Sequence, residues 1–168
     1  KDVSIEEVVK TLLDQEEKNL EPYKNKVNKA NIHDILTLAS MAELEGVKEK
    51  DRKMIVGVFQ NRLSKNMNLG SDVTTYYAFS EDMTKDLTSE MFNTYNPYNT
   101  RSSQMAGKLP VGPICNPSKS SIEASINPTS SDYYYFVADK NGNVYYTKTS
   151  SEHSAKVKEL KDKGDWIW

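Results

Sequence analysis

The sequence is poor in the residues that build crosslinks and metal sites. Its 168 residues include a single cysteine, Cys115, so no internal disulfide can form. The two histidines, His33 and His153, lie far apart in the chain, and no Cys/His cluster accompanies them. A zinc site built from protein side chains is therefore not expected, and we predict no metal and no other cofactor.

Long apolar runs and an excess of basic charge are also missing. No stretch of about 18 apolar residues occurs, so the segment is not expected to span a membrane. The net charge of −2 argues against nucleic acid as the main partner. The first residue is Lys1 and not Met, which suggests an excised piece whose upstream signal or anchor would not be visible here.

The composition that remains is that of a globular chain. With 37% apolar and 27% charged residues, it is long enough to bury a core. We expect one domain over residues 1–168, of α+β class, with a mainly helical part at 1–65. Residues 66–168 are expected to mix loops, short helices and a β-hairpin. The ten tyrosines could pack in the core or bind sugar rings with their aromatic faces.

Helical periodicity and capping signals locate the elements of the first part. The predicted helices are Ile5 to Leu20 after a Ser4/Glu7 capping box, Ile32 to about Leu44 after an Asn31 cap, and Arg52 to about Lys65 after an Asp51 cap. Pro22 is expected to bend or break the chain after the first helix. Gly46 is expected to stop the second helix, and Val47 to Lys50 to connect it to the third.

The second part is more irregular. The predicted elements are a loop or strand leading to a helical turn within Met67–Phe79, short helices at Thr88–Phe92 and Ser118–Ile126, a hairpin of Tyr133–Ala138 with Val144–Thr147, and a last helix from Ser151 to about Lys163. Between them, Asn93 to Pro117 holds four prolines together with several apolar and aromatic residues. We interpret this stretch as an ordered loop that forms a wall of a groove; a packed connector with no ligand is the alternative.

The helix from Ile32 carries two glutamates. Glu43 falls about 60° from the centre of its apolar face, whereas Glu45 falls on the opposite flank, about 200° from Glu43. Burial against apolar neighbours raises the pKa of a carboxyl group and makes it a proton donor near neutral pH. The alternative is that both glutamates edge a core helix and reach solvent, as most such residues do.

Carboxylate chemistry is the chemistry that the sequence favours. His153 is available as a partner for a nucleophile, but no nucleophile elbow or phosphate-binding glycine loop is present. Glu43 on its apolar helix and Asp72 in a polar loop could form the acid and charged partner of a glycosidase. Many proteins hold such pairs, so this pattern alone is weak.

The order of motifs resembles the endolytic murein transglycosylase family (MltG, or YceG-like). The matching blocks are Leu36–Glu43 with its catalytic-helix signature, Phe59–Leu63, Met67–Asp72 with Thr74 and Tyr77, Tyr98–Thr100, Leu109–Ile114 with Asn116–Pro117, and Tyr134–Asp139 with Gly142 and Glu152–His153. Departures from the family pattern are Leu44, Val73 and Val111, together with a longer loop between Thr100 and Leu109. These departures bear on the shape of the groove and on substrate preference.

The resemblance implies an enzyme that cuts the bond between N-acetylmuramic acid and N-acetylglucosamine within peptidoglycan strands and leaves 1,6-anhydro ends. It implies Glu43, the first glutamate, as general acid and then base. The substrate-binding residues that we predict with it are Asn61, Arg62, Ser71, Asp72, Tyr77, Tyr98, Asn99 and Thr100. An ordinary two-carboxylate hydrolase using Glu43 and Asp72, and a non-catalytic glycan-binding scaffold domain, remain as alternatives.

The same resemblance implies where the protein would act. The full-length protein is expected at the extracytoplasmic face of the bacterial cytoplasmic membrane, held by a single-pass anchor upstream of this segment. Peptidoglycan strands are the expected partner, together with proteins of cell-wall synthesis or division. Neither nucleic acid nor direct membrane contact by this segment is expected.

Overall fold

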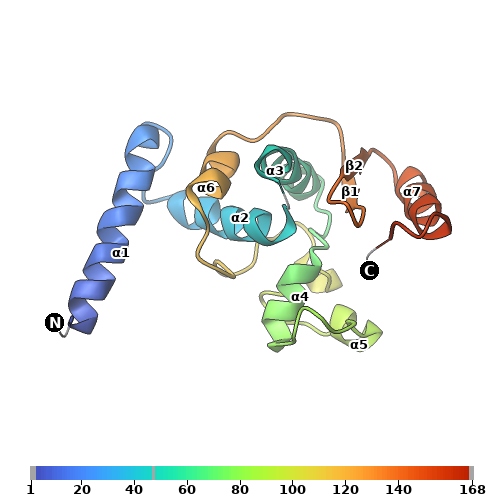
Figure 1. Cartoon of the computed structure of the whole chain (residues 1–168), viewed down its shortest axis with the longest axis horizontal. Coiled ribbons are helices and arrows are strands. Elements are labelled where there is room, and N and C mark those ends of the chain that lie inside the picture. The colour runs from blue at the N-terminus through green and yellow to red at the C-terminus, as the bar shows by residue number, and fades with distance from the viewer. Residues whose placement is uncertain (1–2, 47, 167–168) are drawn as a thin grey trace.

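Helix α2 (Ile32–Glu45) lies at the centre of the fold, in contact with α3 (Glu49–Ser64) and α6 (Lys119–Ile126) (Figure 1). The computed structural model describes residues 3–46 and 48–166. Thr37 to Ala42 of α2 are all buried, so this helix is covered on several sides and not along one stripe. Its length and position therefore set where the glutamates at its C-terminal end can point.

The caps of the helices explain most of their boundaries. Helix α1 (Ile5–Leu20) begins at the predicted Ser4/Glu7 capping box, and the 3-10 turn η1 (Glu21–Tyr23) follows it at Pro22. Helix α2 ends at Gly46, as predicted. Asn31 occupies the predicted N-cap position before it, but the side chain of Asn31 accepts a hydrogen bond from the Asn28 amide and caps no helical N–H.

The start of α3 corrects the sequence prediction. Asp51 was expected to precede this helix, but the helix begins at Glu49, and Asp51 lies within its first turn. Asp51 is buried, and one of its carboxylate oxygens lies 3.4 Å from the Tyr146 hydroxyl of the hairpin. Its acidic side chain still stabilises the helix N-terminus through the helix dipole, which explains why the cap signal was misplaced. Residue 47, in the predicted connection, lies outside the described residues.

The second part of the chain folds around a two-stranded sheet and short helices. These elements are α4 (Asp72–Phe79), α5 (Ser89–Asn93), the 3-10 turn η2 (Ser103–Met105), β1 (Tyr135–Ala138), β2 (Val144–Thr147) and α7 (Ser150–Asp162). The strands are antiparallel, with Tyr135 opposite Thr147 and Ala138 opposite Val144. Helix α7 packs against both strands, and α3 contacts β1 (Figure 1). The predicted hairpin and last helix are confirmed.

The hydrophobic core lies between α2, α3, α6 and the start of α4. Its fully buried members include Met41, Ile55 and Phe59, and Phe136 of the hairpin stacks edge-on against Phe59 at 5.9 Å. Gly57 of α3 is needed where the chain after α6 crosses it, since an added Cβ would lie 2.2 Å from the Thr129 carbonyl oxygen. The fold is α+β, as the sequence predicted.

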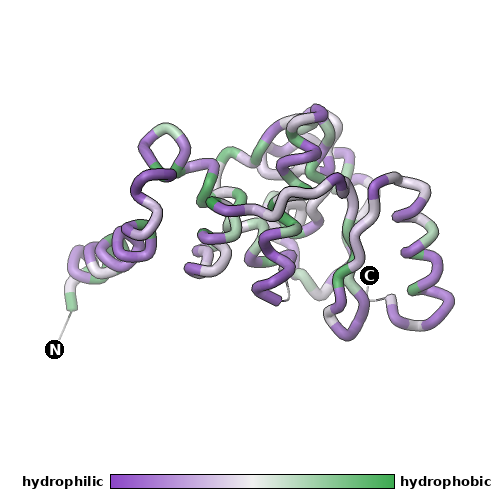
Figure 2. The backbone as a smooth tube through the Cα atoms, turned by 90° about the horizontal axis from the view of Figure 1, so that it is seen from above, coloured by the Kyte–Doolittle hydropathy of each residue, from purple (hydrophilic) through white to green (hydrophobic). Residues whose placement is uncertain are grey.

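Helix α1 lies apart from this core. Figures 1 and 2 show it extending from one end of the molecule, and none of its residues is buried. Among the described residues, no helix is long and apolar enough to cross a membrane.

Candidate active site

A groove with a volume of about 1060 Å³ opens between α2 and α4 on one side and the hairpin and α7 on the other. Both polar and aromatic side chains line it. Those that bear on chemistry are Glu45, Arg62, Asp72, Phe92, Arg101, Tyr135 and His153. A concave site lined by both charged and apolar side chains suits an extended ligand.

Glu45, at the C-terminal end of α2, contributes a partly buried acid to this groove. Its carboxyl group lies among protein atoms, and the Ser71 hydroxyl donates a hydrogen bond to Oε1 at 2.6 Å. Burial raises the pKa of Glu45 to about 7. The Ser71 hydrogen bond opposes this shift, whereas the nearby Asp72 carboxylate adds to it. Glu45 can therefore hold a proton, and release it, near neutral pH.

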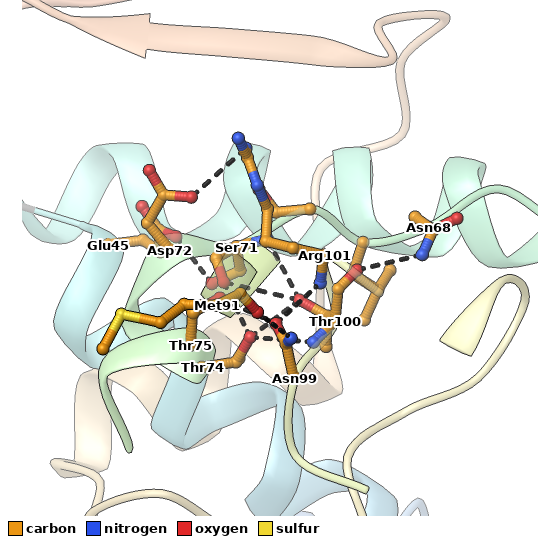
Figure 3. Close-up of polar contacts among 12 residues, drawn as sticks. Glu45, Asn68, Ser71, Asp72, Thr74, Thr75, Met91, Asn99, Thr100 and Arg101 are labelled. Atoms are coloured by element: carbon orange, nitrogen blue, oxygen red, sulfur yellow. Dashed lines mark hydrogen bonds and ion pairs between the residues drawn. The ribbon is translucent and has the colours of Figure 1, made fainter. Parts of the chain in front are cut away.

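Asp72 and Arg101 form an ion pair beside Glu45 (Figure 3). The Arg101 guanidinium lies 3.2 Å from Asp72 Oδ1 and packs on the Phe92 ring, 4.2 Å from its centroid. Burial raises the pKa of Asp72, and Arg101 opposes that rise. Burial outweighs Arg101, so the pKa of Asp72 is raised overall, but its ion pair with Arg101 favours the ionised form. Glu45, whose pKa is raised to about 7, can be neutral beside it.

Arg62, near the end of α3, forms hydrogen bonds to both walls of the groove. Its Nε donates to the Tyr134 carbonyl and one terminal nitrogen donates to the Leu69 carbonyl, each at 2.5 Å. Its guanidinium also lies 4.9 Å from the centroid of the Tyr135 ring. The side chain thus joins the hairpin to the loop before α4, which positions groove residues on both.

Glu43 does not lie in the groove. Its carboxylate accepts hydrogen bonds from the Ser118 amide at 2.9 Å and from the Ser118 and Ser121 hydroxyls at 2.6 and 2.7 Å, and it pairs with Arg52 at 3.0 Å. Burial acts to raise the pKa of Glu43, but these hydrogen bonds and Arg52 outweigh it and lower that pKa. The expected raised pKa is therefore corrected: the face that carries Glu43 is covered by the polar start of α6.

Four of the other predicted site residues are held in structural contacts: Asn61, Ser71, Asn99 and Thr100. Asn61 donates from Nδ2 to the carbonyls of Ser131 and Tyr133, which fixes the chain entering the hairpin. Asn99 and Thr100 are fully buried. Thr100 accepts a hydrogen bond from the Ser71 amide at 3.0 Å and thereby supports the residue that bonds Glu45.

The remaining two predicted residues, Tyr77 and Tyr98, contact each other outside the groove lining, with their ring planes inclined by 60°. Their ring centroids lie 4.8 Å apart, and Tyr77 remains 45% exposed. From the predicted wall at Asn93–Pro117, only Arg101 lines the groove. Of the predicted residues, Arg62 and Asp72 therefore line the groove, and Ser71 contacts it indirectly through its hydrogen bond to Glu45.

Several groove residues were not predicted from the sequence. Arg101 lies in the loop that departs from the family pattern, Tyr135 is one of three consecutive tyrosines, and Phe92 lies in the short helix α5. His153 was noted as a possible partner for a nucleophile and as part of a matching block, but not as a groove residue. The one sequence feature that pointed to this groove was Glu45, the second glutamate of the same helix, two residues after Glu43. Among the described residues, no cluster of three or more His, Cys, Asp or Glu side chains could hold a metal ion.

Comparisons with known proteins agree in the family that they indicate. A family model described as the YceG-like family matches residues 1–159. A Bacillus subtilis (strain 168) protein named endolytic murein transglycosylase is 40% identical over 98% of this chain and 45% of its own length. A Streptococcus pneumoniae (serotype 2, strain D39) protein of the same name is 39% identical over 93% of this chain and 29% of its own length.

A solved structure gives the same result for the fold. The crystal structure of a YceG-like protein from Listeria monocytogenes superposes with a TM-score of 0.82 at 38% identity. That match covers 93% of this chain and 50% of the Listeria chain. The chain thus spans half or less of the length of each of these relatives.

Proposed function

Because the chain belongs to the YceG-like family, we propose that it cleaves murein glycan strands internally as a lytic transglycosylase, with Glu45 as its acid and base. The observation that carries this proposal is a carboxyl group with a pKa of about 7 in the wall of a groove of about 1060 Å³. A strand of linked sugars is an extended ligand of the kind that such a groove can hold. The names of the two relatives support the same reaction.

The reaction needs one carboxyl group that acts twice. Protonated Glu45 would donate its proton to the glycosidic oxygen as the bond to the muramyl anomeric carbon breaks. The resulting carboxylate would then accept the proton of the muramyl 6-hydroxyl as that oxygen attacks the anomeric carbon, which gives the 1,6-anhydro end. No water is consumed, because the nucleophile belongs to the substrate and is already held close.

Ionised Asp72 would stabilise the positive charge that develops on the sugar ring. Arg101 supports this role because it favours the charged form of Asp72. This proposal transfers the acid role expected for Glu43 to Glu45, on the basis of burial, pKa direction and access to the groove. Arg62 and Asp72 remain proposed substrate contacts, and Ser71 acts through its hydrogen bond to Glu45.

Asp72 also supports a second candidate function. A carboxylate in the same groove as a neutral acid could activate a water molecule, which would make the protein a two-carboxylate glycoside hydrolase. Mass spectrometry of purified glycan strands after incubation with the protein separates the two reactions. Transglycosylation is expected to give anhydro-ended fragments; fragments heavier by one water would instead support the hydrolase.

A third outcome of this experiment would show that the protein is not an enzyme. Unchanged strands together with measurable strand binding would support the non-catalytic scaffold that the sequence left open. Murein lies outside the cytoplasmic membrane, so we propose extracytoplasmic action for the full-length protein. A single-pass anchor and partners in cell-wall synthesis or division remain predictions.

A further inference from the structure

His153, on the first turn of α7, has a fixed place in the wall of the groove. Its ring stacks on the Tyr135 ring, with centroids 5.4 Å apart and planes inclined by 27°. Tyr135 is held in turn by the Arg62 guanidinium and by the strand pairing of β1. The imidazole is therefore held between two elements and cannot rotate freely, which leaves its edge to meet a ligand.

The two nitrogens of this imidazole differ in their access to a partner. Nδ1 is buried and has no hydrogen-bond partner within residues 3–46 and 48–166. Burial, with Arg62 nearby, lowers the pKa of His153, so the ring is neutral near pH 7 and carries one N–H. A proton on Nδ1 would be a buried donor without an acceptor, which is costly. The proton therefore belongs on Nε2.

Nε2 also has no hydrogen-bond partner in the part of the chain that the structure describes. His153 lines the same groove as Glu45. We propose that His153 donates a hydrogen bond from Nε2 to an uncharged oxygen of the bound glycan, a hydroxyl or an acetamido carbonyl. A neutral donor adds no second charge beside Arg62, and this suits a neutral sugar oxygen. The proposal rests on the proposed function, because it requires a glycan strand in the groove.

Isosteric variants of His153 test this hydrogen bond. A Gln side chain can place its amide near the position of Nε2, an Asn side chain near that of Nδ1, and Phe keeps only the stacking ring. The experiment measures the dissociation constant of a peptide-free murein hexasaccharide by calorimetry, in a Glu45→Gln background that prevents turnover. We expect His153→Gln to bind within about threefold of the parent, and His153→Phe and His153→Asn to bind about tenfold more weakly.

The matched control is His33, whose side chain is 58% exposed and which does not line the groove. His33→Phe is expected to leave the dissociation constant unchanged. Equal binding by parent and His153→Phe would overturn the inference, as would equal losses in all three His153 variants with unchanged melting temperatures. Absence of binding by the Glu45→Gln parent would instead overturn the proposed function, and this inference with it.

Discussion

Two glutamates that are two residues apart in α2 lie in opposite electrostatic surroundings. Glu43 meets three hydrogen-bond donors and a guanidinium, and its pKa is lowered. Glu45 accepts one hydrogen bond, from the Ser71 hydroxyl, in a partly buried position, and its pKa is raised to about 7. A residue that must release a proton at neutral pH needs the second environment.

The pKa of Glu45 predicts a pH profile. Since the acid must be protonated at the start of the cycle, kcat/KM should fall about tenfold per pH unit above a pH of about 7. The Ser71 hydrogen bond lowers the pKa of Glu45, so Ser71→Ala should move this alkaline limb to higher pH. The measurement is strand cleavage between pH 5 and 9; an identical limb in both proteins would contradict this account of Glu45.

The contacts of Glu43 predict an effect on stability. Glu43→Gln removes the charge that faces Arg52. If its carbonyl oxygen keeps the serine contacts of Oε2, its NH2 group points at the Arg52 guanidinium, so we expect a loss of about 1–3 kcal/mol at pH 7. The folded-state pKa of Glu43 is lowered, so its stabilising effect is present above the unfolded value and is lost as the pH falls through the folded value. Urea unfolding at pH 7 and pH 3 measures both quantities. A difference between wild type and variant that grows toward pH 3 would contradict the lowered pKa.

The roles of these two residues could not be read from the helix alone. Periodicity gives the angle of a side chain around the helix axis, but not what packs on that side. Glu43 is covered by Ser118 and Ser121, more than 70 positions away in the chain, and Glu45 by Ser71 and Asp72 from another segment. Of the candidate site, the sequence therefore predicted Asp72 and Arg62 in the groove, but not the partners that separate the glutamates.

At the scale of elements, the loop from Asn93 to Pro117 is organised by a buried amide. Asn99 donates to the carbonyls of Met91 and Thr94 and accepts from the Thr75 hydroxyl (Figure 3). It is fully buried, so each of these contacts is shielded from water. The loop is thereby joined to α4 and α5, and Arg101, two residues later, is positioned in the groove.

These contacts predict a structural role for Asn99. Asn99→Ala leaves two carbonyls and a hydroxyl without their partner, and we expect it to lower the free energy of unfolding by about 2 kcal/mol or more. Tyr77→Ala, at the exposed ring contact with Tyr98, is the matched control and should cost less than half as much. Thermal unfolding of both variants gives the comparison. If Asn99→Ala has unchanged stability but cleaves glycan more weakly, the result would contradict this structural role and support the sugar contact predicted for Asn99 from the sequence.

Most elements were predictable because their signals are local. The Ser4/Glu7 capping box and the Gly46 stop set helix ends directly, and the Asn141–Gly142 turn marks the hairpin. Asp51 was misplaced because an acidic residue is favourable anywhere in a first helical turn, not only at the cap. The path of the loop at Asn93–Pro117 depends on buried polar contacts with distant segments, which local patterns do not contain.

At the scale of the whole molecule, α1 stands outside the packed body. It packs mainly on the turn that follows it, and its apolar side chains are exposed, with Ile5 at 83% and Leu13 at 65%. Exposed apolar area contributes little to stability in the folded chain. Removal of residues 1–18 should therefore change the melting temperature by less than about 2 °C. Differential scanning calorimetry of the shortened protein checks this; a decrease of 5 °C or more would mean that α1 stabilises the body.

The central claim concerns the residue that performs the chemistry, and a paired turnover measurement tests it most directly. Purified glycan strands are incubated with wild type, Glu45→Gln and Glu43→Gln at pH 6, and the new strand ends are counted per folded protein molecule. We predict a loss of about 10²-fold or more for Glu45→Gln, with folding intact, and retained cleavage by the folded fraction of Glu43→Gln. Cleavage near the wild-type rate by Glu45→Gln, with Glu43→Gln inactive although folded, would contradict the account.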